Sequence, residues 1–273
     1  MAEKTITEFE GYKDNLETRF IEGLPSVEKK LYKDLLDAIR SSNLVKGKFL
    51  NDEQTKALIR KLPKLIRDSF ISSDYLTSAE KYVLNFPKIN EYIKEIHNDI
   101  NGIKVKQPDI TNIQKAEIGF TLENMTGSGM DANFVNPLKE SLYRHIVAGG
   151  NITGAEQILQ DFILSDKEKN SRLSRYVGQV ARDGISQYEG AIQNKIANDY
   201  GMTKIKYVGS LIRDSRKQCR RWVEKSELNF DDLQKEINWA YSNGSGMIPG
   251  TTPENFIINR GGYNCRHTAI PTL

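Results

Sequence analysis

KEKNSRLSRYVGQVARDGISQYEGAIQNKIANDY, residues 167–200, is the longest stretch of this chain in which apolar residues recur at regular spacing. The spacing is about 3.6 residues, which predicts one long amphipathic helix. Its main apolar positions are Leu173, Val177, Val180, Tyr188, Ala191 and Ile192. Gly201 follows directly, and a glycine there is typical of a helix C-terminal cap.

Three glycines, Gly178, Gly184 and Gly190, lie inside this predicted helix. Each costs about 1 kcal/mol of helix stability relative to alanine. Such a cost is tolerated where another backbone must come close, and local flexibility is the other interpretation. Both interpretations stay open from the residues alone.

Most of the chain before this helix is also predicted to be helical. Apolar residues at helical spacing predict a helix over 26–42. Asn51, with Gln54 three residues later, is typical of a capping box that opens the next helix, which Pro63 should end or kink. A third helix is expected over 77–101, opened by Thr77 and Glu80 and interrupted at Pro87. The turn-rich stretch 124–129 suggests a hinge, a helix should begin at Asn136, and Thr153 should cap another.

After Gly201 the pattern changes to a mixture of strands and helices. Residues 204–208 are rich in strand-forming side chains, a helix is expected around 231–241, and 256–258 reads as a strand. We therefore predict a mainly α protein with a small α+β C-terminal module and an elongated helical N-terminal part. The expected regions are a helical region over 1–110, a helical connector with a Gly-rich loop over 111–150, and the module over 151–273.

Composition limits the class of protein. The chain has 273 residues, which fits one or two domains, and its 38% hydrophobic and 27% charged residues exclude a disordered chain. A net charge of +3 is too small to indicate nucleic-acid binding by itself. The sequence shows no secretory signal and no apolar run of about 18 residues, so we expect a protein made in a cytoplasm with no membrane partner.

Two short segments near the C-terminus carry one cysteine each. DSRKQCRRW covers residues 214–222, and GGYNCRH covers residues 261–267. Both combine arginine with carboxylate, amide or imidazole groups, which pair well across a fold through charge-assisted hydrogen bonds. We expect the two segments to meet, with Arg216 or Arg266 bridging to Asp214 and Asn264 satisfying backbone groups of a turn.

The order of these parts resembles the C-terminal module of Mu F-like minor head proteins, the phage head-morphogenesis family. That module has an arginine in a long helix, then a strand, an Asp-x-Arg…Cys segment, a variable Gly/Pro-rich loop and a terminal Asn-Cys-Arg-[Cys/His] motif. The matching residues here, over about 150–273, are Arg182, Asp214, Arg216, Cys219, Asn264, Cys265, Arg266 and His267. The chain departs from the family at Trp222, where a second cysteine is common, and at Gly262-Tyr263, which replaces His-Pro.

The resemblance implies a virion structural protein rather than an enzyme. Such a protein is assembled in the host cytoplasm, resides in the head or portal region of the virion, and aids head morphogenesis or DNA delivery. Its expected partners are the portal and other phage head proteins. No cofactor is implied.

The cysteines leave several interpretations open. Cys219, Cys265 and His267 could hold zinc with Asp214 as a fourth ligand, although structural zinc usually has four Cys or His ligands, so we assign no metal. A disulfide between the cysteines would close a loop of about 45 residues and add about 4 kcal/mol. The remaining interpretations are two buried thiols packed near each other, and a Cys–His catalytic pair, for which the sequence indicates no orienting group.

A basic cluster follows Ile212, and it could contact DNA phosphates nonspecifically, contact an acidic partner, or form a solvated helix face. Its members are Arg213, Arg216, Lys217, Arg220, Arg221 and Lys225. A DNA-binding internal protein ejected with the genome is therefore one alternative function. A toxin-like hydrolase or transferase is the other, and a deep pocket lined by Asp214, Cys219 and His267 would favour it.

Overall fold

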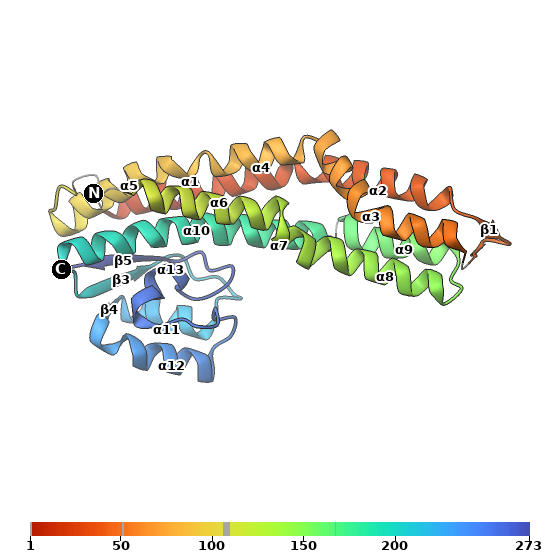
Figure 1. The fold of residues 1–273 in the computed structure, drawn as a ribbon. Helices are drawn as coiled ribbons and strands as arrows, with labels where there is room; N and C mark the ends of the chain where they lie inside the picture. The colour runs from red at the N-terminus through yellow and green to blue at the C-terminus, as the bar shows by residue number, and fades with distance from the viewer. Residues whose placement is uncertain (1, 51, 106–109, 167) are drawn as a thin grey trace. The chain divides into compact units, whose positions relative to one another are not determined.

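A computed structural model of the protein describes residues 2–50, 52–105, 110–166 and 168–273 (Figure 1). The helices are α1 (Ala2–Glu22), α2 (Leu24–Arg40), α3 (Glu53–Ser72), α4 (Tyr75–Val83), α5 (Ile89–Asn101), α6 (Thr111–Thr126), α7 (Ser128–Met130), α8 (Asn136–Val147), α9 (Ile152–Ile163), α10 (Arg172–Tyr200), α11 (Lys217–Lys225), α12 (Leu233–Asn243) and α13 (Phe256–Asn259). Short helical turns are η1 (Phe86–Lys88), η2 (Asp131–Val135), η3 (Phe230–Asp232) and η4 (Pro253–Asn255). The strands are β1 (Leu44–Val45), β2 (Lys48–Phe49), β3 (Lys204–Val208), β4 (Glu227–Asn229) and β5 (Thr268–Thr272).

The chain folds into two compact units built from segments that are distant in sequence. Unit 1 comprises Met1–Asn15, Val83–Phe120 and Ala181–Leu273, and unit 2 comprises Leu16–Tyr82 and Thr121–Val180. The boundaries fall inside α1, α4, α6 and α10, so each of these helices contributes residues to both units. Each unit draws on more than one of the three regions predicted from the sequence.

Unit 2 is built on α2, α3, α8 and α9, which pack against one another. Each helix buries one apolar stripe, as its helical spacing requires. The stripes include Leu31, Leu35 and Ile39; Ile59, Leu62 and Ile66; Leu138, Leu142 and Ile146; and Ala155, Leu159 and Ile163. The β1–β2 hairpin turns at Lys46 and Gly47, whose φ angles of 50° and 76° suit a tight two-residue turn.

Unit 1 contains the α+β module. Its antiparallel sheet has the strand order β4-β3-β5, and β5 pairs with β3 from Lys204↔Thr272 to Val208↔Thr268. All five residues of β5 are buried, because α10 runs beside this part of the sheet (Figure 1) and α11 packs on β3. The predicted fold class, mainly α with a small α+β C-terminal module, is confirmed.

Several local predictions are also confirmed. The helix expected over 26–42 is α2, and the strand expected over 204–208 is β3. Helical structure is interrupted around Pro87, which lies in η1, and α5 ends at Gly102 with a φ of 64°. Gly201 follows α10 with a φ of 60°, the left-handed backbone that glycine adopts without strain.

Pro63 does not end its helix, because α3 runs from Glu53 to Ser72 without a break. Buried Ile59, Leu62 and Ile66 hold one face of α3 in the core of unit 2, and their burial offsets the lost backbone hydrogen bond. The N-cap of α3 is Asp52, while Asn51, like Lys167 at the expected start of the long helix, lies outside the described residues.

The prediction of a strand at 256–258 is wrong, since these residues form α13. Thr252 and Asn255 make a reciprocal capping box with Pro253 in the first turn, which starts helical structure here. Phe256 and Ile257 are both fully buried, and three consecutive apolar residues fit a buried helical turn as well as a strand.

Three expected helix boundaries differ as well, and one of them is the start at Thr77, which lies inside α4. The N-cap of α9 is Asn151, whose side chain accepts a hydrogen bond from Gly154 N at 2.8 Å, rather than Thr153. The break in the 124–129 stretch is confined to Gly127, between α6 and α7.

No helix within the described ranges combines the length and the apolar character that a bilayer crossing requires.

Candidate functional site

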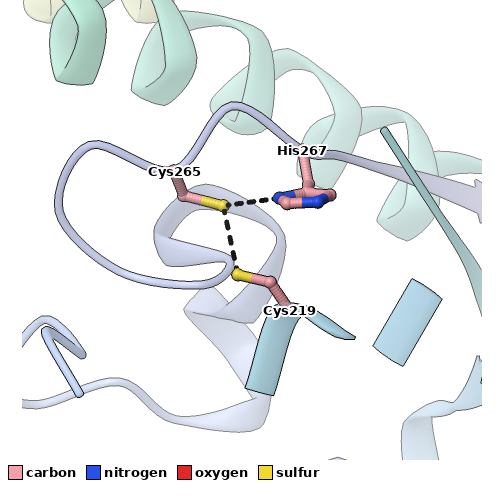
Figure 2. A group of neighbouring side chains, drawn as sticks. All are labelled: Cys219, Cys265 and His267. Carbon is pink, nitrogen blue, oxygen red and sulfur yellow. Dashed lines mark hydrogen bonds between the residues drawn. The ribbon is translucent and has the colours of Figure 1, made fainter. Parts of the chain in front are cut away.

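The two cysteine-bearing segments meet in unit 1. Cys219 Sγ lies 4.0 Å from Cys265 Sγ, and Cys265 Sγ lies 3.6 Å from His267 Nδ1 (Figure 2). All three side chains are buried, with at most 5% of each residue exposed. The structure therefore brings together three of the residues singled out from the sequence.

Strand pairing explains why these segments meet. In an antiparallel pair, the end of one strand lies beside the beginning of the other. Val208 at the end of β3 pairs with Thr268 at the start of β5, so Gly209 faces His267. The chain then enters α11 at Lys217, which places Cys219 in its first turn.

Two glycines leave space for the cluster. A Cβ at Gly261 would lie 2.5 Å from Cys219 Sγ, 2.9 Å from Cys265 Sγ and 3.0 Å from Tyr207 Oη. A Cβ at Gly209, whose φ is +142°, would lie 2.8 Å from His267 Cδ2. Any larger residue at either position would displace a cluster side chain, because Cβ contacts of this length are sterically forbidden.

Tyr207 of β3 contacts all three residues of the cluster. Its hydroxyl donates to Cys219 Sγ at 3.8 Å and lies 3.3 Å from Cys265 Sγ. Its ring stacks on the His267 imidazole with 5.4 Å between centroids, and meets Trp222 edge to face at 5.4 Å. Burial raises the pKa of Tyr207 well above its usual value, so the hydroxyl keeps its proton and remains a donor.

The two thiols differ in acidity. The hydrogen bond from Cys219 lowers the pKa of Cys265 well below its usual value, with further lowering by His267 and Arg260. The same hydrogen bond, together with burial, raises the pKa of Cys219. The two thiols share a hydrogen bond, so they titrate as a pair.

Arg216 ties the two segments together, but through backbone groups. Its Nη1 donates to Gly261 O at 2.9 Å, and its Nη2 donates to Tyr263 O. The expected bridge to Asp214 does not occur within the described part of the chain, where Asp214 is exposed and Arg266 Nη1 lies 3.7 Å from Asp14 Oδ1 instead. Gly261 O also accepts a hydrogen bond from Gln218 Nε2 at 3.1 Å, so two side chains of the first cysteine-bearing segment bond this carbonyl group of the second.

Arg182 and Asn264 also come together in the structure. Arg182 Nη1 donates to Asn264 Oδ1 at 3.0 Å. The backbone N–H of Asn264 donates to Asp183 Oδ1 at 2.5 Å, and its φ of 58° is one that asparagine tolerates better than most residues. These contacts fasten the terminal motif to α10.

Most of the basic cluster is engaged within the protein. Arg220 donates to the carbonyl groups of Ser215, Ile212 and Arg213. Arg221 and Lys225 both bond the buried carboxylate of Glu236, at 2.8 and 2.5 Å. Only Arg213 and Lys217 of the predicted contact residues are exposed without such a contact among the described residues.

A buried ion network beside the cluster was not foreseen from the sequence. Glu189 Oε2 accepts from Lys13 Nζ at 2.7 Å and from Arg260 Nη1 at 3.2 Å. Lys13 also donates to Thr268 Oγ1 at 2.9 Å, and Arg260 donates to His267 O at 2.8 Å. Glu189 lies off the apolar stripe predicted for the long helix, so the spacing of apolar residues did not mark it as buried.

A cavity of about 520 Å³ opens beside the cluster, and all of its lining residues belong to unit 1. Cys219, Cys265 and His267 form part of its wall, and Asp214 and Arg216 also line it. Glu10 lines the cavity as well, and burial raises its pKa. The site thus combines soft ligand atoms with an approach route for a small molecule or solvent.

Searches of protein-family models, curated proteins and solved structures find no match to this chain.

Proposed function

We propose that this chain is a phage virion structural protein, a minor head protein of the Mu F-like type. It would be associated with the portal or the capsid interior, where it aids head morphogenesis or DNA delivery. In this proposal the protein acts through contacts with the portal and other head proteins, and it catalyses no reaction.

The meeting of the two cysteine-bearing segments is the observation that carries this proposal. The resemblance to the family rests on the order of an Asp-x-Arg…Cys segment and a terminal Asn-Cys-Arg-His segment, which makes sense only if they form one unit. Arg216 bonds to Gly261 O, and the two sulfurs lie 4.0 Å apart. Segments far apart in space would have removed the main support for the proposal.

The bonding of these residues agrees with a mechanical role. Arg182 bonds to Asn264, Arg216 bonds to Gly261 O, and the N–H of Asn264 bonds to the Asp183 carboxylate. Arg220, Arg221 and Lys225 are likewise engaged inside the protein, which leaves little of the basic cluster for DNA phosphates. A module that is held together by internal hydrogen bonds and ion pairs suits a protein that acts by binding other proteins.

Particle composition tests the proposal. Phage particles from a host genome that encodes this chain would be purified on a density gradient and analysed by mass spectrometry. We expect peptides of the chain at a small fixed ratio to the major capsid protein, and loss of infectivity when the gene is deleted. Complementation with Arg213→Ala, an exposed site, serves as the control for complementation with Arg216→Ala. Particles that hold capsid and portal proteins but not this chain would refute the proposal.

The cavity favours a second candidate, a thiol-dependent hydrolase or transferase. It is lined by Asp214, Cys219 and His267, the combination that would support such a function. His267 Nε2, however, has no hydrogen-bond partner within the described ranges, so no carboxylate there orients the imidazole as a catalytic base requires.

Alkylation by iodoacetamide at neutral pH separates the two candidates. A nucleophilic cysteine must react in the native protein, whereas a buried structural thiol is inert until the protein unfolds. We expect both thiols to be protected until denaturant is added. Rapid loss of one thiol in the native state, followed by mapping of the label to Cys265, would favour the enzyme.

A further inference from the structure

The buried Cys219, Cys265 and His267 cluster offers the ligand set that zinc prefers. Zinc takes thiolate sulfur and imidazole nitrogen in tetrahedral geometry, and thiolate ligands distinguish it from magnesium and calcium, which prefer oxygen. One ligand atom from each of the three residues can be chosen so that all lie within 4.8 Å of one another. Cys219 Sγ and the His267 imidazole both lie beside Cys265 Sγ (Figure 2).

Two of the three distances between ligand atoms lie close to the edges of a zinc tetrahedron. With Zn–S near 2.3 Å and Zn–N near 2.0–2.1 Å, the edges are about 3.8 Å between two sulfurs and about 3.6 Å between sulfur and nitrogen. The structure has 4.0 Å between the two Sγ atoms and 3.6 Å between Cys265 Sγ and His267 Nδ1. All three ligand atoms lie within 4.8 Å of one another, so an adjustment of up to about 1 Å brings them to the edges of the tetrahedron.

The surroundings resemble the outer shell of a metal site. Tyr207 donates to Cys219 Sγ and stacks on His267, so it orients two of the three ligands. Gly261 is packed so closely over both sulfurs that even a methyl group would collide with them. Metal sites commonly depend on such outer residues to fix the directions of their ligands.

The fourth position faces the cavity. All three ligands line the same 520 Å³ space. Asp214 also lines it but does not belong to the group whose ligand atoms lie within 4.8 Å, so its carboxylate does not close the site in this arrangement. A site with three protein ligands keeps one position for solvent or a small ligand.

We infer that Cys219, Cys265 and His267 bind one Zn²⁺ ion, with a water molecule from the cavity as the fourth ligand. The site is independent of the proposed function, since a structural protein and an enzyme could both contain it. The sequence contains only three Cys or His ligands for this site, and the water molecule from the cavity provides the fourth.

Cobalt substitution tests this site in the full-length protein. The reduced protein, freed of metal with a chelator, would be titrated with Co²⁺ and then with Zn²⁺. We expect one Co²⁺ per chain, visible bands of a tetrahedral site, a sulfur-to-cobalt charge-transfer band, and displacement by one equivalent of Zn²⁺. A colourless wild-type protein whose two thiols titrate as free would overturn the inference, and so would a protein in which both cysteines are already joined as a disulfide.

Variants locate the ligands. Cys219→Ser and Cys265→Ser should abolish the charge-transfer band or reduce it by half, and His267→Asn should weaken Co²⁺ binding at least tenfold. His145→Asn, on α8 in unit 2, is the matched control and should bind as the wild type does. Circular dichroism of each variant checks folding, and the wild-type titration stands even if a variant fails to fold.

Sodium azide, a small anionic ligand, tests the open position. Azide should shift the visible bands of the Co²⁺ protein, because it replaces the water that faces the cavity. An unchanged spectrum at saturating azide would show that a protein group closes the site, and would overturn the open fourth position.

Discussion

Gly190 on α10 lies directly against the backbone of Ile257 on α13. A Cβ at position 190 would be 2.6 Å from Ile257 O and 2.7 Å from Ile258 Cα. Two backbones can come this close only where one residue has no side chain. This contact places α13 against α10, and so positions Arg260 and the turn that leads to Cys265.

Gly190→Ala should therefore destabilise the protein by about 1–3 kcal/mol, since an added methyl group forces two backbones apart. Gly178→Ala is the matched control on the same helix, because its Cβ would meet only Ile21 Cδ1 at 3.6 Å. That variant should be neutral or more stable by up to about 1 kcal/mol, as alanine favours helix. Thermal melting followed by circular dichroism measures both, and equal effects would contradict the close approach.

Arg216→Ala should lower the free energy of unfolding by about 1–3 kcal/mol, because it leaves two carbonyl groups without their charged donor. Asp214→Ala should change it by less than about 0.5 kcal/mol, since Asp214 is exposed and pairs with neither Arg216 nor Arg266 within the described residues. Urea unfolding followed by tryptophan fluorescence suits the measurement, because Trp222 and Trp239 both lie in unit 1. A larger loss at Asp214 than at Arg216 would reverse the assignment.

Glu189→Gln should destabilise unit 1 by about 3–5 kcal/mol, the usual cost of leaving a buried charge without its partner. Lys13 and Arg260 would both lose their counter-ion, and both are almost wholly buried. Glu8→Gln, in an exposed pair with Lys4, is the control and should change stability by less than about 0.5 kcal/mol. Urea titration with fluorescence detection compares them, and a mild effect at Glu189 would mean that water enters the network.

Glu236 should make stability depend on pH in the acid range. Hydrogen bonds from Arg221, then Lys225 and Trp222, lower its pKa to about 2 in the folded protein. A folded pKa below the unfolded value of about 4.3 means that this stability is present above pH 4–5 and is lost as the pH falls toward 2.

Glu236→Gln should thus cost about 2–3 kcal/mol at pH 7, and the difference from wild type should shrink between about pH 4.5 and 2. Glu224→Gln, on an exposed position of α11, should show no such pH dependence. Urea midpoints measured across this range give the result. A difference that stays constant with pH would rule out the carboxylate as its source.

The spacing of apolar residues predicted helices such as α2 and α10 well. The buried face of a helix appears in the sequence as a repeat within one continuous segment. The spacing failed at 256–258, where three apolar residues carry no period and the capping box at Thr252 decided the helix. The helix also does not end at Pro63, where packing of the neighbouring apolar residues outweighed the local preference of proline.

For the candidate site, the order of motifs predicted that Cys219 and Cys265 would meet, and the structure places their sulfurs 4.0 Å apart. The partner of Arg216 was not predictable, because every residue has a backbone carbonyl group and the sequence does not show which one accepts the hydrogen bond. Lys13 was missed for a different reason: it lies more than 170 residues from Glu189, and nothing local distinguishes it from a solvent-exposed lysine.

The amino-acid sequence alone determined the class of fold and the residue types of the site, since helical spacing, turn residues and the two cysteine motifs are local properties. Tertiary structure alone decided which groups are neighbours: the β3–β5 register that brings His267 to Gly209, and the ion network of Lys13, Glu189 and Arg260. The physical reason is that hydrogen bonds and ion pairs depend on distances of a few ångströms between atoms, and only the packing of distant segments sets those distances.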